Sequence, residues 1–137
     1  MQKPGKNLEA ILNALLKLHG QIRAAVTAAY EQTDFTQLSR IAKEEEGDTI
    51  YVVDRIGEAL LVEFFQKEMR PFFPLVLVAE GIPNGRMMLP AGTPEKEAHW
   101  RIIVDPIDGT RGLMYQKRSA WILTGVAENR GVKTSLP

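Results

Sequence analysis

The sequence predicts a mixed α/β fold of the α+β kind, in which helices pack on a sheet. Three observations predict it. Apolar residues recur at helical spacing in two segments, and continuous apolar runs typical of buried strands follow them. The predicted order is helix, extended piece, helix, strand, strand, short helix, strand. A length of 137 residues suits one core, so we expect residues 1–137 to form a single domain.

Residues 7–32 are predicted to form the first helix. Gly20 interrupts this helix of good helix formers, and we expect a close packing contact to explain it. His19 lies on the apolar face and is interpreted as structural. Residues 54–69 are predicted to form the second helix, with Asp54 at its N-cap. The apolar stripe of the first helix comprises Leu8, Ile11, Leu12, Leu15, Leu16, Ile22, Val26 and Ala29.

Two connecting segments have contrasting compositions. Residues 49–53 (TIYVV) are all β-branched or aromatic, and they predict an extended piece before the second helix. Residues 83–97 are rich in Pro, Gly, Asn and charge, and predict a surface excursion.

Three apolar runs predict the strands of the sheet. Residues 75–79 (LVLVA) suit a strand buried on both faces, and Glu80 follows them. Residues 101–104 predict a second buried strand that ends at Asp105, and residues 119–127 predict a third. Because ligands of open α/β sheets bind at the carboxyl ends of strands, Asp105 at the end of the second strand is a candidate for a site.

Composition excludes several classes of function. Lys and Arg total 17 and Asp and Glu total 17, so the basic surplus of a nucleic-acid partner is absent. There is no cysteine, which excludes disulfides, thiolate metal sites and a thiol nucleophile. No apolar run is long enough to span a membrane, and the first residues lack the apolar core of a signal peptide. We therefore expect a cytoplasmic location.

The most informative segment is DPIDGT, residues 105–110. Asp105 and Asp108 can turn toward the same side of a tight turn, and their hard oxygen ligands suit Mg²⁺, or Mn²⁺, better than zinc. Gly109 lets a phosphate approach the backbone. Thr110 would open a short helix whose free N–H groups favour an anion. Together these features predict a metal and phosphate site.

This segment resembles the signature of the inositol monophosphatase family, the lithium-sensitive, magnesium-dependent phosphatases of sugar phosphates. The resemblance extends from the first helix to Gly131 and implies the layered helix and sheet sandwich of that family. It implies that Glu80, Asp105 and the backbone carbonyl of Ile107 hold one metal ion. Asp105 and Asp108 would hold part of a second.

The resemblance also implies catalytic and substrate-binding roles. Asp54 and Thr110 would polarise the attacking water, with Thr110 passing a proton to Asp54, and Asp108, Gly109 and Thr110 would bind the substrate. The implied reaction is hydrolysis of a phosphate monoester, such as an inositol phosphate or a related small phosphorylated substrate, by water that Mg²⁺ activates. A homodimer is a further expectation.

Two departures from the family pattern leave alternatives open. Gly81 stands where the family has a second glutamate. The family also has a Trp-Asp motif later in its sequence, and in this chain neither Trp100 nor Trp121 is followed by an aspartate. The chain is therefore similar to the N-terminal half of these longer proteins, and its last strand would have an unpaired edge. One alternative is a catalytically incomplete relative that acts as a metal-binding or phosphate-binding module or as a regulatory subunit. The other is a structural or interaction domain.

Overall fold

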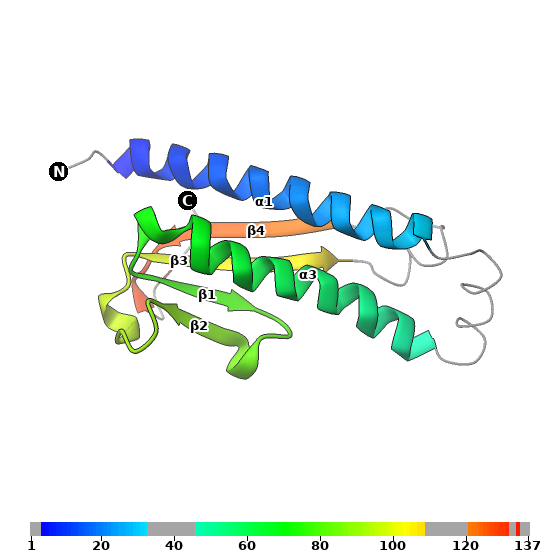
Figure 1. The fold of residues 1–137 in the computed structure, drawn as a ribbon. Helices are drawn as coiled ribbons and strands as arrows, with labels where there is room; N and C mark the ends of the chain where they lie inside the picture. The colour runs from blue at the N-terminus through cyan, green and yellow to red at the C-terminus, as the bar shows by residue number, and fades with distance from the viewer. Residues whose placement is uncertain (1–3, 33–45, 109–120, 132–133, 135–137) are drawn as a thin grey trace.

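The computed structural model describes residues 4–32, 46–108, 121–131 and 134 (Figure 1). The described residues form two long α-helices and one sheet of four strands, with short 3-10 turns between them. The elements are α1 (Pro4–Gln32), α3 (Glu46–Glu68), β1 (Leu75–Ala79), β2 (Arg86–Leu89), β3 (Trp100–Asp108) and β4 (Trp121–Glu128); the 3-10 turns are Arg70–Phe72, Pro83–Gly85 and Glu95–Glu97.

The sheet has the strand order β2-β1-β3-β4. β1 is parallel to β3 and antiparallel to β2, and β4 is antiparallel to β3. The predicted α+β class is confirmed by this mixed sheet and its helices. Among the described strands β4 lies at an edge, as the sequence predicted for the last strand.

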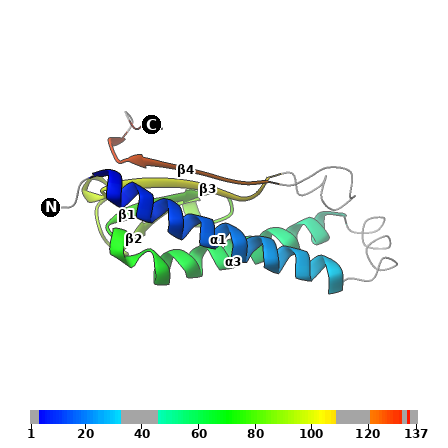
Figure 2. The same cartoon turned by 90° about the horizontal axis from the view of Figure 1, so that it is seen from above.

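Both helices cover the same face of the sheet, with α1 packed beside α3 (Figures 1 and 2). The core lies between the helices and this face, because alternate strand residues point toward the helices. Burial of this apolar surface is the main stabilising term of the fold. The core includes Ile11, Leu15, Leu18 and Ile22 of α1, Leu61, Phe64 and Phe65 of α3, and Leu75, Leu77, Ile102 and Val104 of the strands.

The predicted extended piece at residues 49–53 is wrong, because these residues lie in the first turns of α3. Short β-branched runs fit either conformation, and the acidic residues Glu46 and Asp48 favour the start of a helix. Asp54 is therefore an interior residue of α3, and its predicted position as N-cap is also wrong.

The strands differ from the predictions in three ways, two in their limits and one in burial. Residues 86–89 of the predicted surface excursion form β2, a short edge strand whose four residues carry little periodic signal. β3 continues past residue 104 to Asp108, so Asp105 lies inside a strand. The prediction that residues 101–104 form a buried strand holds for Ile102 and Val104, whereas Ile103 is 52% exposed.

Gly20 does not make the close contact that the sequence predicted. A Cβ placed on Gly20 has no atom of the described residues within 4 Å, so it meets open space in that part of the chain. None of the helices in the part of the chain that the structure describes is long and apolar enough to cross a membrane.

Candidate functional site

The site begins at the edge of the sheet where β1 ends beside β3. These two strands are parallel neighbours, and Ala79 pairs with Val104 in their register. Glu80 comes directly after Ala79, beyond the end of β1, and Asp105 comes directly after Val104 within β3. Each acidic residue therefore follows one member of the same strand pair. The predicted neighbourhood of these two acidic residues is therefore present in the backbone.

Asp105 is held in an irregular part of β3. Its Oδ1 accepts a hydrogen bond from the backbone N–H of Ile107 at 3.2 Å, and the pairing of β3 with β4 shifts between Asp105 and Asp108. A proline is tolerated at such a bulge because it has no N–H for the strand ladder, which explains Pro106 inside a strand. The predicted tight turn at residues 105–108 is thus a bulged strand end.

The remaining motif residues are described only in part. Asp108 pairs with Trp121 through its backbone, and its side chain lies outside the described residues. Gly109 and Thr110, with the predicted helix that Thr110 would open, lie outside them altogether. Their predicted roles in binding the substrate and activating water stay predictions.

α3 approaches this strand end closely at Gly57. A Cβ placed on Gly57 would lie 3.2 Å from Cβ of Pro106 and 3.4 Å from Cδ1 of Ile107. A side chain at this position would make tighter contacts than usual, so glycine lets the helix lie near the bulge without a shift of its neighbours. Asp54, one turn before Gly57, is half-buried and is brought to the same end of the sheet.

Glu58 is a site residue that sequence reasoning missed. It lies one turn after Asp54 on the same face of α3, and a Cβ on Gly81 would collide with its carboxylate. Burial raises the pKa of the Glu58 carboxyl, and the negative charges of Asp54 and Glu80 raise it further, although Arg55 opposes them. The four-residue spacing from Asp54 was visible in the sequence, but the contact with Gly81 was not.

The acidic residues of this edge suit a hard cation by their chemistry. Carboxylate oxygens are the ligands that Mg²⁺ prefers, and a cation would relieve the mutual repulsion that Asp54 and Glu80 exert on Glu58. Within residues whose side chains are described, no three His, Asp or Glu groups lie close enough to hold a metal ion. The assignment of Glu80 and Asp105 to a metal ion stays a prediction.

Comparison with known proteins finds likeness in solved structures. No family model matches the chain. No curated protein matches it. The crystal structure of extragenic suppressor protein suhB from Bartonella henselae has a TM-score of 0.59 and 16% identity, over 89% of this chain and 40% of that one. Inositol monophosphatase II from Staphylococcus aureus MSSA476 has a TM-score of 0.59 and 17% identity, over 87% of this chain and 38% of that one.

The chain has the fold of these structures. The inositol monophosphatase likeness inferred from DPIDGT is thereby confirmed as a likeness of fold, independently of the motif. The chain spans about two fifths of the length of the solved structures that it matches, as the 40% and 38% coverages show.

Proposed function

We propose that the chain belongs to a magnesium-dependent phosphatase that hydrolyses the phosphate monoester of a small molecule, with an inositol phosphate or a related sugar phosphate as its substrate. One observation carries the proposal. Glu80 and Asp105, the acidic residues that the motif assigns to a metal ion, follow the paired residues Ala79 and Val104 on adjacent parallel strands. Two separate stretches of sequence therefore supply carboxylates to one edge of the sheet.

The metal ligands in this proposal are the side chains of Glu80, Asp105 and Asp108 and the backbone carbonyl of Ile107. Bound Mg²⁺ would supply charge neutralisation at the phosphate and would lower the pKa of a water molecule. The bulge of β3 is suited to its part in this arrangement, because it turns the Asp105 carboxylate back toward the N–H of Ile107 and fixes its orientation.

The proton-handling residues in the proposal are Asp54 and Thr110. Asp54, on α3, would accept a proton from the Thr110 hydroxyl, and that hydroxyl would orient the attacking water. Gly57 supports this role because it lets α3 lie close to Pro106 and Ile107 of the motif strand. The backbone N–H groups of Gly109 and Thr110 would bind the phosphate oxygens.

A second candidate function is binding of metal or phosphate without turnover, in a relative that lacks part of the catalytic set or that regulates another protein. The observation that favours it is Gly81, which stands where the family pattern has a second glutamate. In that case the acidic residues at the ends of β1 and β3 would bind Mg²⁺ weakly, because they would form only part of the set of oxygen ligands.

The experiment measures release of inorganic phosphate from inositol 1-phosphate and a panel of sugar phosphates while Mg²⁺ is titrated. Asp105→Asn and Glu80→Gln are compared with Glu97→Gln, a control at an exposed carboxylate outside this edge. We expect turnover that depends on Mg²⁺, is inhibited by Li⁺, falls at least about 100-fold in the two site variants and is unchanged in the control.

Calorimetry of Mg²⁺ binding separates the two candidates. Binding that both site variants weaken, without turnover on any ester, selects the binding function. Turnover that does not need Mg²⁺, or that survives Asp105→Asn at full rate, contradicts the proposed phosphatase.

A further inference from the structure

Two neighbouring leucines on the outer side of α1 are exposed. Leu12 is 54% and Leu16 is 57% exposed, and their spacing of four residues makes them neighbours on one face of the helix. Figures 1 and 2 show α1 at the margin of the molecule, where no described helix or strand covers its outer side. These leucines therefore belong to a helix face that the described part of the chain leaves open.

The residues around Leu16 are arranged symmetrically along this face. Glu9 and Arg23 lie seven residues before and after Leu16, and Leu12 and Gly20 lie four residues before and after it. Steps of four and seven residues return to nearly the same side of an α-helix, so the five form one row, here named the α1 row. All five are exposed.

This order makes the α1 row complementary to itself. If two copies pack their α1 helices antiparallel about a two-fold axis at Leu16, Glu9 of each copy lies opposite Arg23 of the other. Leu12 of each copy likewise lies opposite Gly20 of the other. A two-fold interface brings the same surface of both copies together, so both favourable contacts occur twice.

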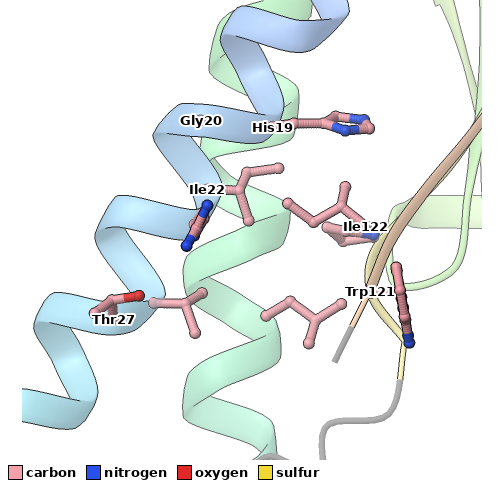
Figure 3. Close-up of a pocket in the computed structure, with 10 residues that line it drawn as sticks. His19, Gly20, Ile22, Thr27, Trp121 and Ile122 are labelled. Atoms are coloured by element: carbon pink, nitrogen blue, oxygen red, sulfur yellow. The ribbon is translucent and has the colours of Figure 1, made fainter. Parts of the chain in front are cut away.

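Gly20 provides space for the leucine of a second copy. A Cβ placed on Gly20 meets no atom of the described residues within 4 Å. Figure 3 shows the pocket of about 670 Å³ that Gly20 lines, together with His19 and Arg23 of α1 and residues of β3 and β4. Glycine inside a helix is unfavourable relative to alanine, and the close approach of a second helix explains its presence here.

The charges at the two ends of the α1 row are available for contacts between copies. The salt bridges of the described residues include neither Glu9 nor Arg23. A guanidinium group and a carboxylate can form two parallel hydrogen bonds. The formal net charge of the chain is zero, so overall charge does not keep two copies apart.

We propose that two copies of this chain associate through the α1 row, as an antiparallel pair of helices with Leu16 at the two-fold axis. One pair of helices buries less than the roughly 800 Å² per partner of a standard interface, so we expect a dissociation constant in the micromolar range. The inference gives the expected homodimer a surface and does not depend on the proposed phosphatase activity.

Sedimentation equilibrium from micromolar to near-millimolar concentration tests the interface, with Leu16→Glu as the central variant. We expect its dissociation constant to be at least about 100-fold higher, because two leucines lose their contact and two carboxylates meet at the axis. Gln21→Glu introduces the same group at an exposed position of α1 outside the row and should dimerise like the parent. Circular dichroism of dilute samples should show that both variants are folded, because neither side chain belongs to the core.

Exchange of the two charges tests the pairing of Glu9 with Arg23. Glu9→Arg and Arg23→Glu should each weaken self-association at least about tenfold, because like charges then face each other twice. An equimolar mixture of these two variants should associate like the parent, because every contact between unlike chains again joins opposite charges. Glu97→Arg and Lys96→Glu make the same changes of charge at exposed positions outside the row and should have no effect.

Three outcomes would overturn the proposal. The first is a parent chain that stays monomeric at near-millimolar concentration. The second is a dimer that Leu16→Glu does not weaken, since such a dimer uses another surface, for example the edge of β4. The third is a mixture of the Glu9→Arg and Arg23→Glu variants that associates no better than either variant alone.

Discussion

The two helices meet the same face of the sheet in different ways, and a glycine stands at each meeting. At Gly57 of α3 a Cβ would lie 3.2 Å from Cβ of Pro106, whereas at Gly20 of α1 it would meet none of the described residues within 4 Å. The first glycine permits contact, and the second leaves a gap. The structural role of a glycine inside a helix therefore depends on which residues face that position.

The two regions also differ in charge. The close contact of α3 with β3 brings Asp54 and Glu58 toward Glu80, where like charges add to burial in raising the pKa of Glu58. The open region between α1 and β4 is lined by Arg23 and by no carboxylate among the described residues. Among the described residues, α3 thus adds carboxylates to the candidate cation site, whereas α1 presents a cation to the open region.

The largest expected effect comes from filling the close contact. Gly57→Leu would force α3 away from Pro106 and Ile107, and we expect the free energy of unfolding to fall by about 2–3 kcal/mol. Urea denaturation followed by circular dichroism measures it. An unchanged midpoint would mean that α3 does not pack closely on the bulge of β3.

Gly20→Leu is the matched substitution in the open region and has the opposite expected sign. We expect the free energy of unfolding to rise by about 0.5–1 kcal/mol, because leucine favours the helix and meets no atom within 4 Å of its Cβ. The same urea titration checks it. If Gly20→Leu destabilised the chain as much as Gly57→Leu, the contrast between the two regions would be wrong.

A smaller effect is expected from His19, which connects α1 to β4. Its Nε2 lies 2.8 Å from Oγ1 of Thr124, and burial lowers the pKa of its imidazole. The unfolded chain then binds the proton more readily than the folded chain, so stability is full above about pH 6.5 and falls as the pH decreases below it.

His19→Gln removes the titrating group, so the variant should lose less stability than the parent between pH 7.5 and 5.5. Thermal unfolding at several pH values measures both slopes. Identical slopes in parent and variant would contradict the assignment of this pH dependence to His19.

The smallest effect is expected at the ion pair between the helices. Nζ of Lys17 lies 3.6 Å from Oε2 of Glu68, and the two side chains are 58% and 51% exposed. Such pairs contribute little, so Lys17→Ala should cost at most about 0.5 kcal/mol, and less in high salt. A loss above 1 kcal/mol in urea denaturation, insensitive to salt, would show that this pair holds α1 on α3.

The parts of this fold that follow local rules could be predicted from the sequence. The first helix and the strand at residues 75–79 follow from their apolar patterns, although Leu12 and Leu16 of the predicted stripe are exposed. The rule that ligands bind at strand ends led to Asp105, and the family resemblance led to Glu80. Residues 49–53 could not be assigned correctly, because β-branched residues occur in both helices and strands when the context outweighs propensity.

Features that depend on long-range contact were missed for a physical reason. Gly57 and Glu58 matter because of Pro106 and Gly81, which are distant in the sequence and approach only after folding. The sequence identifies Gly20 as an unusual residue inside a helix, but it does not indicate whether other residues pack against that position. The pocket that it lines also takes residues of β3 and β4, which are distant in the sequence and meet α1 only after folding.

The most direct test of the proposed cation site is paramagnetic broadening by Mn²⁺ in an amide NMR spectrum of the chain. Mn²⁺ bound between the ends of β1 and β3 should broaden the signals of Glu80, Gly81 and Asp105 together at low occupancy, and leave those of Gly20 and Arg23 sharp. An excess of Mg²⁺ should restore them, and Asp105→Asn should prevent the broadening. Broadening centred on other acidic residues, or broadening of Glu80 without Asp105, would contradict a shared site at this edge.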